Sequence, residues 1–206
     1  MPAMFMCVLL LVLLYQYKLR KIEQEEQKKE AEYLKLEHKA SLPIKRSLNN
    51  LTYFTISLDN LPFHKDATGR LATIQNTITD LSNKKICNLA GLTNTDLKLK
   101  YGANNLETLS SYDENYTLFL RTLAEWSEQL FIEGFEEDAL LVSQYALQCN
   151  TDISKTYTTL ARIYKKQGNI DSIYALLPIA ESHSGIIDLK KAIYDVLNEI
   201  YPVQSI

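Results

Sequence analysis

The sequence has little cysteine, histidine, glycine and tryptophan: its 206 residues include three cysteines, three histidines, six glycines and one tryptophan. Cys7, Cys87 and Cys149 lie far apart, which argues against a disulfide framework and a Cys-x-x-Cys metal knuckle. We expect Cys87 and Cys149 to be small buried residues of a protein in a reducing compartment.

Motifs of catalysis are also missing. None of His38, His64 and His183 has a second histidine, a cysteine or a carboxylate at the spacing of a helical metal motif. The sequence contains no glycine-rich loop that would hold a phosphate and no Gly-x-Ser-x-Gly turn. We therefore expect no enzyme activity, no catalytic residue, no metal site and no cofactor.

Strong net charge is absent as well. The chain carries 22 Lys and Arg against 25 Asp and Glu, a net charge of −3. Residues 16–50 hold nine of the basic residues and six glutamates, so this segment is +3 and the remainder is −6. A weakly acidic chain has no general attraction for nucleic acid, and we expect no nucleic-acid partner.

One long apolar run is present, at the N-terminus. It covers residues 3–17, which is short of the roughly 20 residues that span a bilayer. Lys18, Arg20 and Lys21 follow at once, as expected on the cytoplasmic side of a membrane helix, whereas a cleaved signal carries its positive charge before the apolar core. We predict a single-pass transmembrane anchor over residues 1–17 with the C-terminal domain in the cytoplasm; a buried core helix is the alternative.

Residues 18–45 are predicted to form a helical juxtamembrane stalk. Up to residue 40 the segment contains no glycine or proline, and Glu25 and Lys29 form a supporting pair at the i, i+4 spacing. Its apolar residues are too sparse for a sustained heptad seam, which favours a solvated single helix over a coiled coil. Pro43 is expected to end this helix.

Residues 46–112 are predicted to be a small helical or mixed segment that caps the domain after it. Phe54, Ile56 and Leu58 alternate with polar residues, which suggests a short strand, and residues 85–89 are the nearest partner for it. We therefore expect one or two short strands before the helical domain.

A helix is expected between these two segments, and a longer one after them. Leu71, Ile74, Ile78 and Leu81 repeat at spacings of three and four, and Asp66 could cap the helix that carries them. The longer helical run is expected to open at Asp113.

The C-terminal part contains a repeat, whose period is the distance between Gly134 and Gly168. Other pairs keep the same offset: Leu123 with Tyr157, Trp126 with Leu160, Ser127 with Ala161, Leu130 with Tyr164, and Ala146 with Ala180. This pattern over residues 120–185 resembles the tetratricopeptide repeat (TPR) family of antiparallel helical hairpins, which has a period of about 34 residues. Ile173, where the family has a small residue, and Thr151 and Gly185, where it has a proline, depart from the pattern.

The resemblance implies a mainly α fold in which residues 113–206 form a TPR-like domain, closed by a capping helix over residues 186–200. Small residues would let the helices approach, large ones would fill the grooves, and the glycines would form the turns. The residues expected in these roles are Trp126, Leu130, Gly134, Ala139, Ala146, Tyr157, Leu160, Ala161, Tyr164, Gly168 and Ala180.

The resemblance also implies a groove lined by the first helix of each hairpin. The candidate partner-binding residues are Arg121, Glu125, Glu128, Lys155, Arg162, Lys165 and Lys166. The second hairpin is basic there, which favours an acidic peptide. We predict a membrane-anchored adaptor or scaffold that binds a partner protein or peptide; the alternative is a structural, non-catalytic subunit of a larger membrane or envelope assembly.

Overall fold

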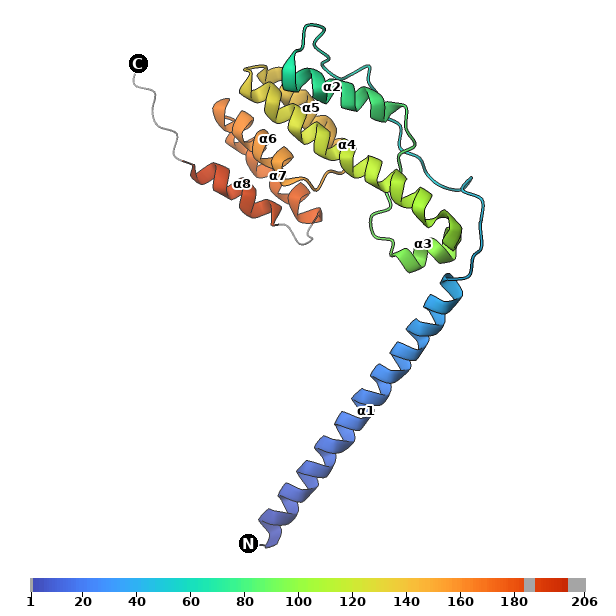
Figure 1. The fold of residues 1–206 in the computed structure, drawn as a ribbon. Helices are drawn as coiled ribbons and strands as arrows, with labels where there is room; N and C mark the ends of the chain where they lie inside the picture. Colours follow the sequence, from blue (N-terminus) through green and yellow to red (C-terminus); the bar gives the residue numbers. More distant parts are fainter. Residues whose placement is uncertain (1, 184–187, 200–206) are drawn as a thin grey trace. The chain divides into compact units, whose positions relative to one another are not determined.

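The structure is a computed structural model that describes residues 2–183 and 188–199, and the elements in these residues are almost all helical (Figure 1). The described residues form eight α-helices and one short 3₁₀ turn, η1. Their bounds are α1 Pro2–Ala40, α2 Gly69–Ser82, α3 Asn94–Tyr101, η1 Ala103–Asn105, α4 Leu106–Ile132, α5 Glu136–Gln148, α6 Ser154–Lys166, α7 Ile170–Ser182 and α8 Leu189–Asn198. The prediction of a mainly α fold is confirmed.

The chain divides into two compact units. One contains Met1–Leu51 with Leu89–Leu109, and the other contains Thr52–Asn88 with Ser110–Ile206. The predicted domain boundaries after residues 17, 45 and 112 stay predictions.

In the first unit, α3 packs against the C-terminal end of α1. The Glu37 carboxylate of α1 accepts a hydrogen bond from the Thr95 hydroxyl and lies 3.7 Å from Lys98 Nζ. α1 is one helix that ends at Ala40, shortly before Pro43, as predicted. Within the part of the chain that the structure describes, no helix has both the length and the apolar character needed to cross a membrane.

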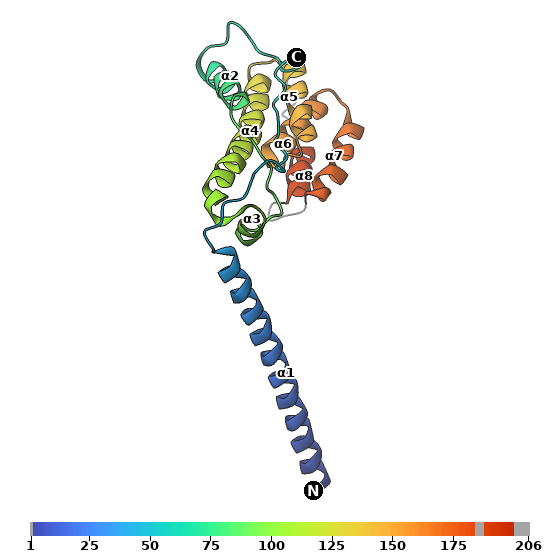
Figure 2. The same ribbon diagram turned by 90° about the vertical axis from the view of Figure 1, so that its right-hand side faces the viewer.

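The second unit has two clusters of buried side chains. The first joins α2, α4 and α5 (Figure 1). Phe119, Leu123 and Trp126 of α4 are fully buried in it. The second joins α6, α7 and α8, and α6 packs against both of these helices and against α5 (Figure 2). α6 is therefore the central element of the C-terminal half.

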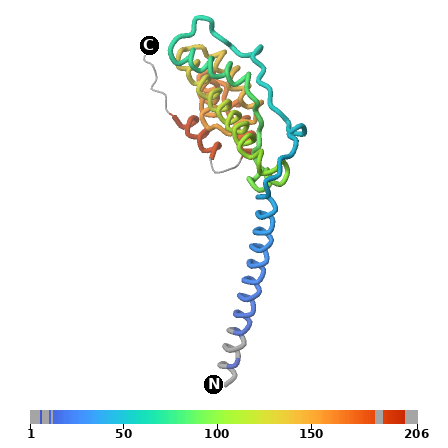
Figure 3. The backbone as a smooth tube through the Cα atoms, turned by 45° about the vertical axis from the view of Figure 1, so that its right-hand side comes forward, coloured from blue at the N-terminus to red at the C-terminus, as the bar shows by residue number. Residues whose placement is uncertain are grey.

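The predicted strands are wrong. Phe54 and Ile86 form a single antiparallel bridge, in which the Phe54 N–H donates to the Ile86 carbonyl at 2.8 Å, and the described residues contain no strand. Residues 52–63 run without regular structure, as Figure 3 shows. The alternation of apolar and polar residues does mark which side chains face the core, because Ile56 is buried and Phe54 packs on the core. The described core is helical, however, and offers no second strand for further pairing.

Two predicted helix starts also need correction. The apolar stripe of α2 is buried as expected, but Thr68 rather than Asp66 precedes the helix. α4 begins at Leu106 and not at Asp113. The buried Asn105 side chain donates to the Tyr101 carbonyl at 2.8 Å and so closes the preceding turn, after which a helix can start at once.

Candidate protein-binding surface

The two turns at Gly134 and Gly168 have the same geometry. Both glycines have positive φ, 87° and 71°. The N–H groups of Gly134 and Phe135 donate to the carbonyls of Phe131 and Leu130, at 3.2 and 2.9 Å. Around Gly168 the equivalent bonds, from residues 168 and 169 to residues 165 and 164, measure 3.0 and 2.8 Å. The predicted glycine turns are confirmed, and each is a helix end closed by two backbone hydrogen bonds.

The residues expected to pack inside the hairpins lie in the core. Ile173 is fully buried although it is larger than the residue expected there, and Tyr164 is half-buried. Thr151, which replaces the expected proline, accepts a 2.9 Å hydrogen bond from the Tyr157 hydroxyl through its carbonyl. Gly185 and part of the predicted capping helix lie outside the described residues, but α8 covers the rest. The buried members of the predicted set are Trp126, Leu130, Ala139, Ala146, Tyr157, Leu160, Ala161 and Ala180.

Most of the charged residues predicted to bind a partner are paired with one another or with neighbouring helices. Three ion pairs connect α2 to α4, α4 to α6, and α6 to the end of α8, and we call them the charge ladder. The pairs are Arg70 with Glu125 at 3.4 Å, Lys155 with Glu128 at 2.6 Å, and Arg162 with Glu199 at 3.0 Å. Arg121 is exposed on α4.

Lys165 and Lys166 point to different neighbours. Lys165 Nζ donates to the backbone carbonyls of Val196, Leu197 and Glu199 at 2.5, 3.2 and 2.5 Å. These carbonyls lie at the C-terminal end of α8, where a helix leaves carbonyls unpaired and favours positive charge. Lys166 pairs with Glu136 of α5. The basic side chains of α6 thus already hold parts of this chain.

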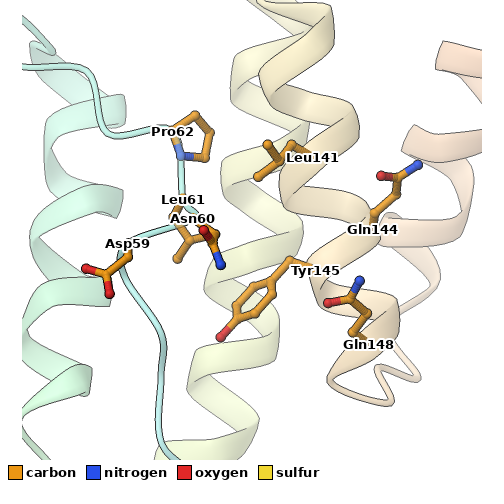
Figure 4. A pocket seen from close by; sticks show the side chains of 8 residues that line it. All are labelled: Asp59, Asn60, Leu61, Pro62, Leu141, Gln144, Tyr145 and Gln148. Carbon is orange, nitrogen blue, oxygen red and sulfur yellow. The ribbon is translucent and has the colours of Figure 1, made fainter.

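A separate hollow of about 590 Å³ lies between residues 59–62 and α5. Figure 4 shows Asn60 and Pro62 opposite Leu141 and Tyr145. Gln144 and Gln148 complete its far side. The sequence alone did not indicate this site, because its two sides are far apart along the chain and neither carries a motif.

The loop beside the hollow is fixed to α5 by two polar contacts. The Ser57 N–H donates to the Tyr145 hydroxyl oxygen at 3.2 Å, and His64 Nε2 lies 2.7 Å from Asp138 Oδ2. The His64 ring also meets the Phe135 ring edge to face, with centroids 4.5 Å apart. The sequence has no carboxylate at a helical metal-motif spacing from His64, whose partner Asp138 lies 74 positions further along the chain.

Cys87 and Cys149 are buried, as predicted. Cys87 and Cys149 are free thiols that expose 2% and 5% of their surface. Burial raises the pKa of both thiols, that of Cys149 to about 11, so neither is a nucleophile near neutral pH. Within the described residues no group of histidine, cysteine and carboxylate side chains could hold a metal ion.

These features define an all-α protein whose C-terminal half is built from helical hairpins around a central α6 and carries a ladder of ion pairs. No protein-family model, no curated protein and no solved structure matches the chain.

Proposed function

We propose that this protein is a membrane-anchored adaptor whose TPR-like hairpins bind an acidic peptide segment of a partner protein. The observation that carries the proposal is the contact between α6 and the end of α8. Arg162 holds a carboxylate, that of Glu199, and Lys165 holds three backbone carbonyls. The same cations could hold a carboxylate and the backbone of another chain.

The repeat supports the scaffold part of this proposal. The helix ends at Gly134 and Gly168 have equivalent hydrogen bonds and are each followed by a second helix, as a TPR-like array requires. Such arrays serve as binding surfaces for other proteins, and the charge ladder runs over α4 and α6, the first helices of the two hairpins.

The exposed apolar side chains of α1 support the anchor. Leu11, Leu13, Leu14 and Tyr15 each expose more than half of their surface, although they point in different directions around the helix. An apolar segment whose described side chains are exposed on several sides favours an apolar environment, which a membrane provides. Lys18, Arg20 and Lys21 favour a cytoplasmic location for the domain that follows.

Glu199 offers a direct test, because on this proposal it competes with the partner for Arg162. In Glu199→Gln the carboxylate is lost but the side chain keeps its size. We expect fluorescein-labelled hexaglutamate to bind the full-length variant, in detergent, up to several-fold more tightly than it binds the wild type, since the Arg162–Glu199 pair is partly exposed and an exposed ion pair contributes about 0.2–1 kcal/mol. Fluorescence anisotropy measures the affinity, and hexalysine is the control peptide.

Asp195→Asn is the matched control variant. Asp195 lies on α8, four residues before Glu199, is exposed, and pairs with Lys191 of the same helix at 3.0 Å. It should leave hexaglutamate binding unchanged, whereas Arg162→Gln should weaken it. Equal affinities for the wild type, Glu199→Gln and Arg162→Gln would show that α6 is not the binding face.

A further inference from the structure

The hollow beside α5 is separate from the charge ladder in both position and chemistry. It is formed by residues 59–62 and by one face of α5, whereas the ladder lies on α2, α4, α6 and the end of α8. Its volume of about 590 Å³ lies within the range of about 300–1,000 Å³ that is usual for ligand sites. It is therefore large enough to receive part of another molecule.

Three side-chain amides are among the residues that line the hollow, and they suit a peptide backbone. Gln144 and Gln148 have the i, i+4 spacing on α5 and so share one face of the helix. Asn60 lies on the other side of Leu141 and Tyr145, and the Gln144 amide points away from it, so a ligand that meets all three amides must lie across α5 (Figure 4). Each carboxamide offers one acceptor oxygen and two N–H donors, which complement the N–H and C=O of a peptide unit. Both glutamines are exposed, and the one hydrogen bond of the Gln144 amide among the described residues is a long 3.4 Å contact to the Tyr164 hydroxyl.

The remaining lining favours an uncharged ligand with some apolar surface. Leu141 exposes 42% of its surface and faces Pro62 across the hollow (Figure 4). The lining residues include no lysine, arginine or histidine. Asp59 is the only acidic one, and its carboxylate points away from Leu141 and Tyr145 (Figure 4). The hollow thus has neither a cation for an acidic ligand nor an inward carboxylate for a basic one.

We propose that this hollow binds an uncharged, extended peptide segment, whose backbone pairs with the carboxamides of Asn60, Gln144 and Gln148 and whose apolar side chains contact Leu141 and Pro62. This peptide segment would belong to the same partner protein that binds the charge ladder. The inference therefore rests on the proposed function, from which it takes the idea that the ligand is a protein. An extended segment fits because its backbone N–H and C=O groups point sideways and are free to pair with the carboxamides, whereas a helical segment pairs these groups internally.

The test is a selection of random displayed peptides on the full-length protein in lipid nanodiscs. We expect one enriched group of peptides to be uncharged and to lose about tenfold or more in affinity for the double variant Gln144→Ala, Gln148→Ala, which removes two amide contacts. Both glutamines are exposed, so the variant should fold like the wild type. The matched control is Gln129→Ala, Gln167→Ala, which removes two glutamines outside the hollow and should change nothing.

The other outcomes separate the two proposals. Uncharged peptides that bind the double variant as well as the wild type would overturn the hollow as a site. A selection that yields only acidic peptides, sensitive to Arg162→Gln, would overturn the hollow while supporting the charge ladder. If no peptide is enriched over empty nanodiscs, both proposals fail.

Discussion

At the scale of single residues, burial controls the chemistry of the groups that could otherwise react. Cys149 is buried near the end of α5, and the Tyr116 hydroxyl donates to its carbonyl at 2.5 Å. Tyr157 is fully buried, and its hydroxyl donates to the Thr151 carbonyl. Burial raises the pKa of Cys149 from 9.0 to about 11 and that of Tyr157 from 10.0 to about 12.

These pKa values predict that the folded protein loses stability in alkaline solution. Between pH 9 and pH 11 the Cys149 thiol ionises in the unfolded chain but keeps its proton in the folded one. Its contribution is therefore complete below pH 9 and falls by about 1.4 kcal/mol for each pH unit between pH 9 and pH 11. In urea unfolding across this pH range, the free energy of unfolding should fall less steeply with pH for Cys149→Ala than for the wild type.

Tyr157→Phe provides a second, independent reading of the same effect. The Tyr157 hydroxyl ionises at about pH 10 in the unfolded chain and at about pH 12 in the folded one. The stability of the variant should therefore follow that of the wild type near pH 9 and fall less steeply at higher pH. Loss of the hydrogen bond to Thr151 lowers the stability of the variant by a constant amount. Parallel pH profiles for the wild type and both variants would mean that neither side chain is buried as described.

At the scale of elements, the hairpin turns are the features that the sequence predicted best. Gly134 and Gly168 have the positive φ that the pattern required, and the helices begin and end around them as expected. This success has a local cause, because a left-handed helix terminator is decided by the few residues around it. The helix start at Leu106 could not be found in the same way, since it depends on the buried turn at Asn105.

Gly168→Val should destabilise the protein by more than about 1 kcal/mol, because a β-branched residue is strained at positive φ. Apart from Gly168 and its two chain neighbours, no described atom lies within 4 Å of the position of an added Cβ, so strain in the backbone and not a clash would be the cause. Thermal unfolding compares this variant with Gly168→Asn, which should lose less because asparagine tolerates the left-handed region. An equal loss for both variants would contradict this account of the turn.

At the scale of the whole molecule, the apolar N-terminal segment is expected to decide where the protein resides. Replacing Leu11 and Leu14 of α1 by Asp should release the protein from membranes into the soluble fraction, because each carboxylate costs about 2.5–3.5 kcal/mol in the centre of a membrane helix. Alkaline carbonate extraction followed by sedimentation measures the distribution. Replacing Leu34 and Leu36, which are exposed further along the same helix, is the control and should leave the protein in the pellet.

A wild-type protein that sediments no better than the Leu11 and Leu14 variant would contradict the anchor. The adaptor could then be tested without detergent, since the charge ladder and the hollow both belong to the second unit.

The sequence by itself determined the features that depend on near neighbours. Its helical composition, the buried stripe of α2 and the glycine turns are all set by residues within a few positions of one another. It also indicated which side chains of the hairpins would be buried, because residues of similar size recur at the same offset in the two hairpins.

Only the tertiary structure decided what the charged and polar residues do. Arg162 and Glu199 are 37 positions apart, and His64 and Asp138 are 74 apart, so no periodic pattern connects them. The predicted basic face is consequently a set of paired charges, and the hollow beside α5 exists because a non-helical segment packs across that helix. Such contacts depend on how helices pack together, and local propensity does not encode that arrangement.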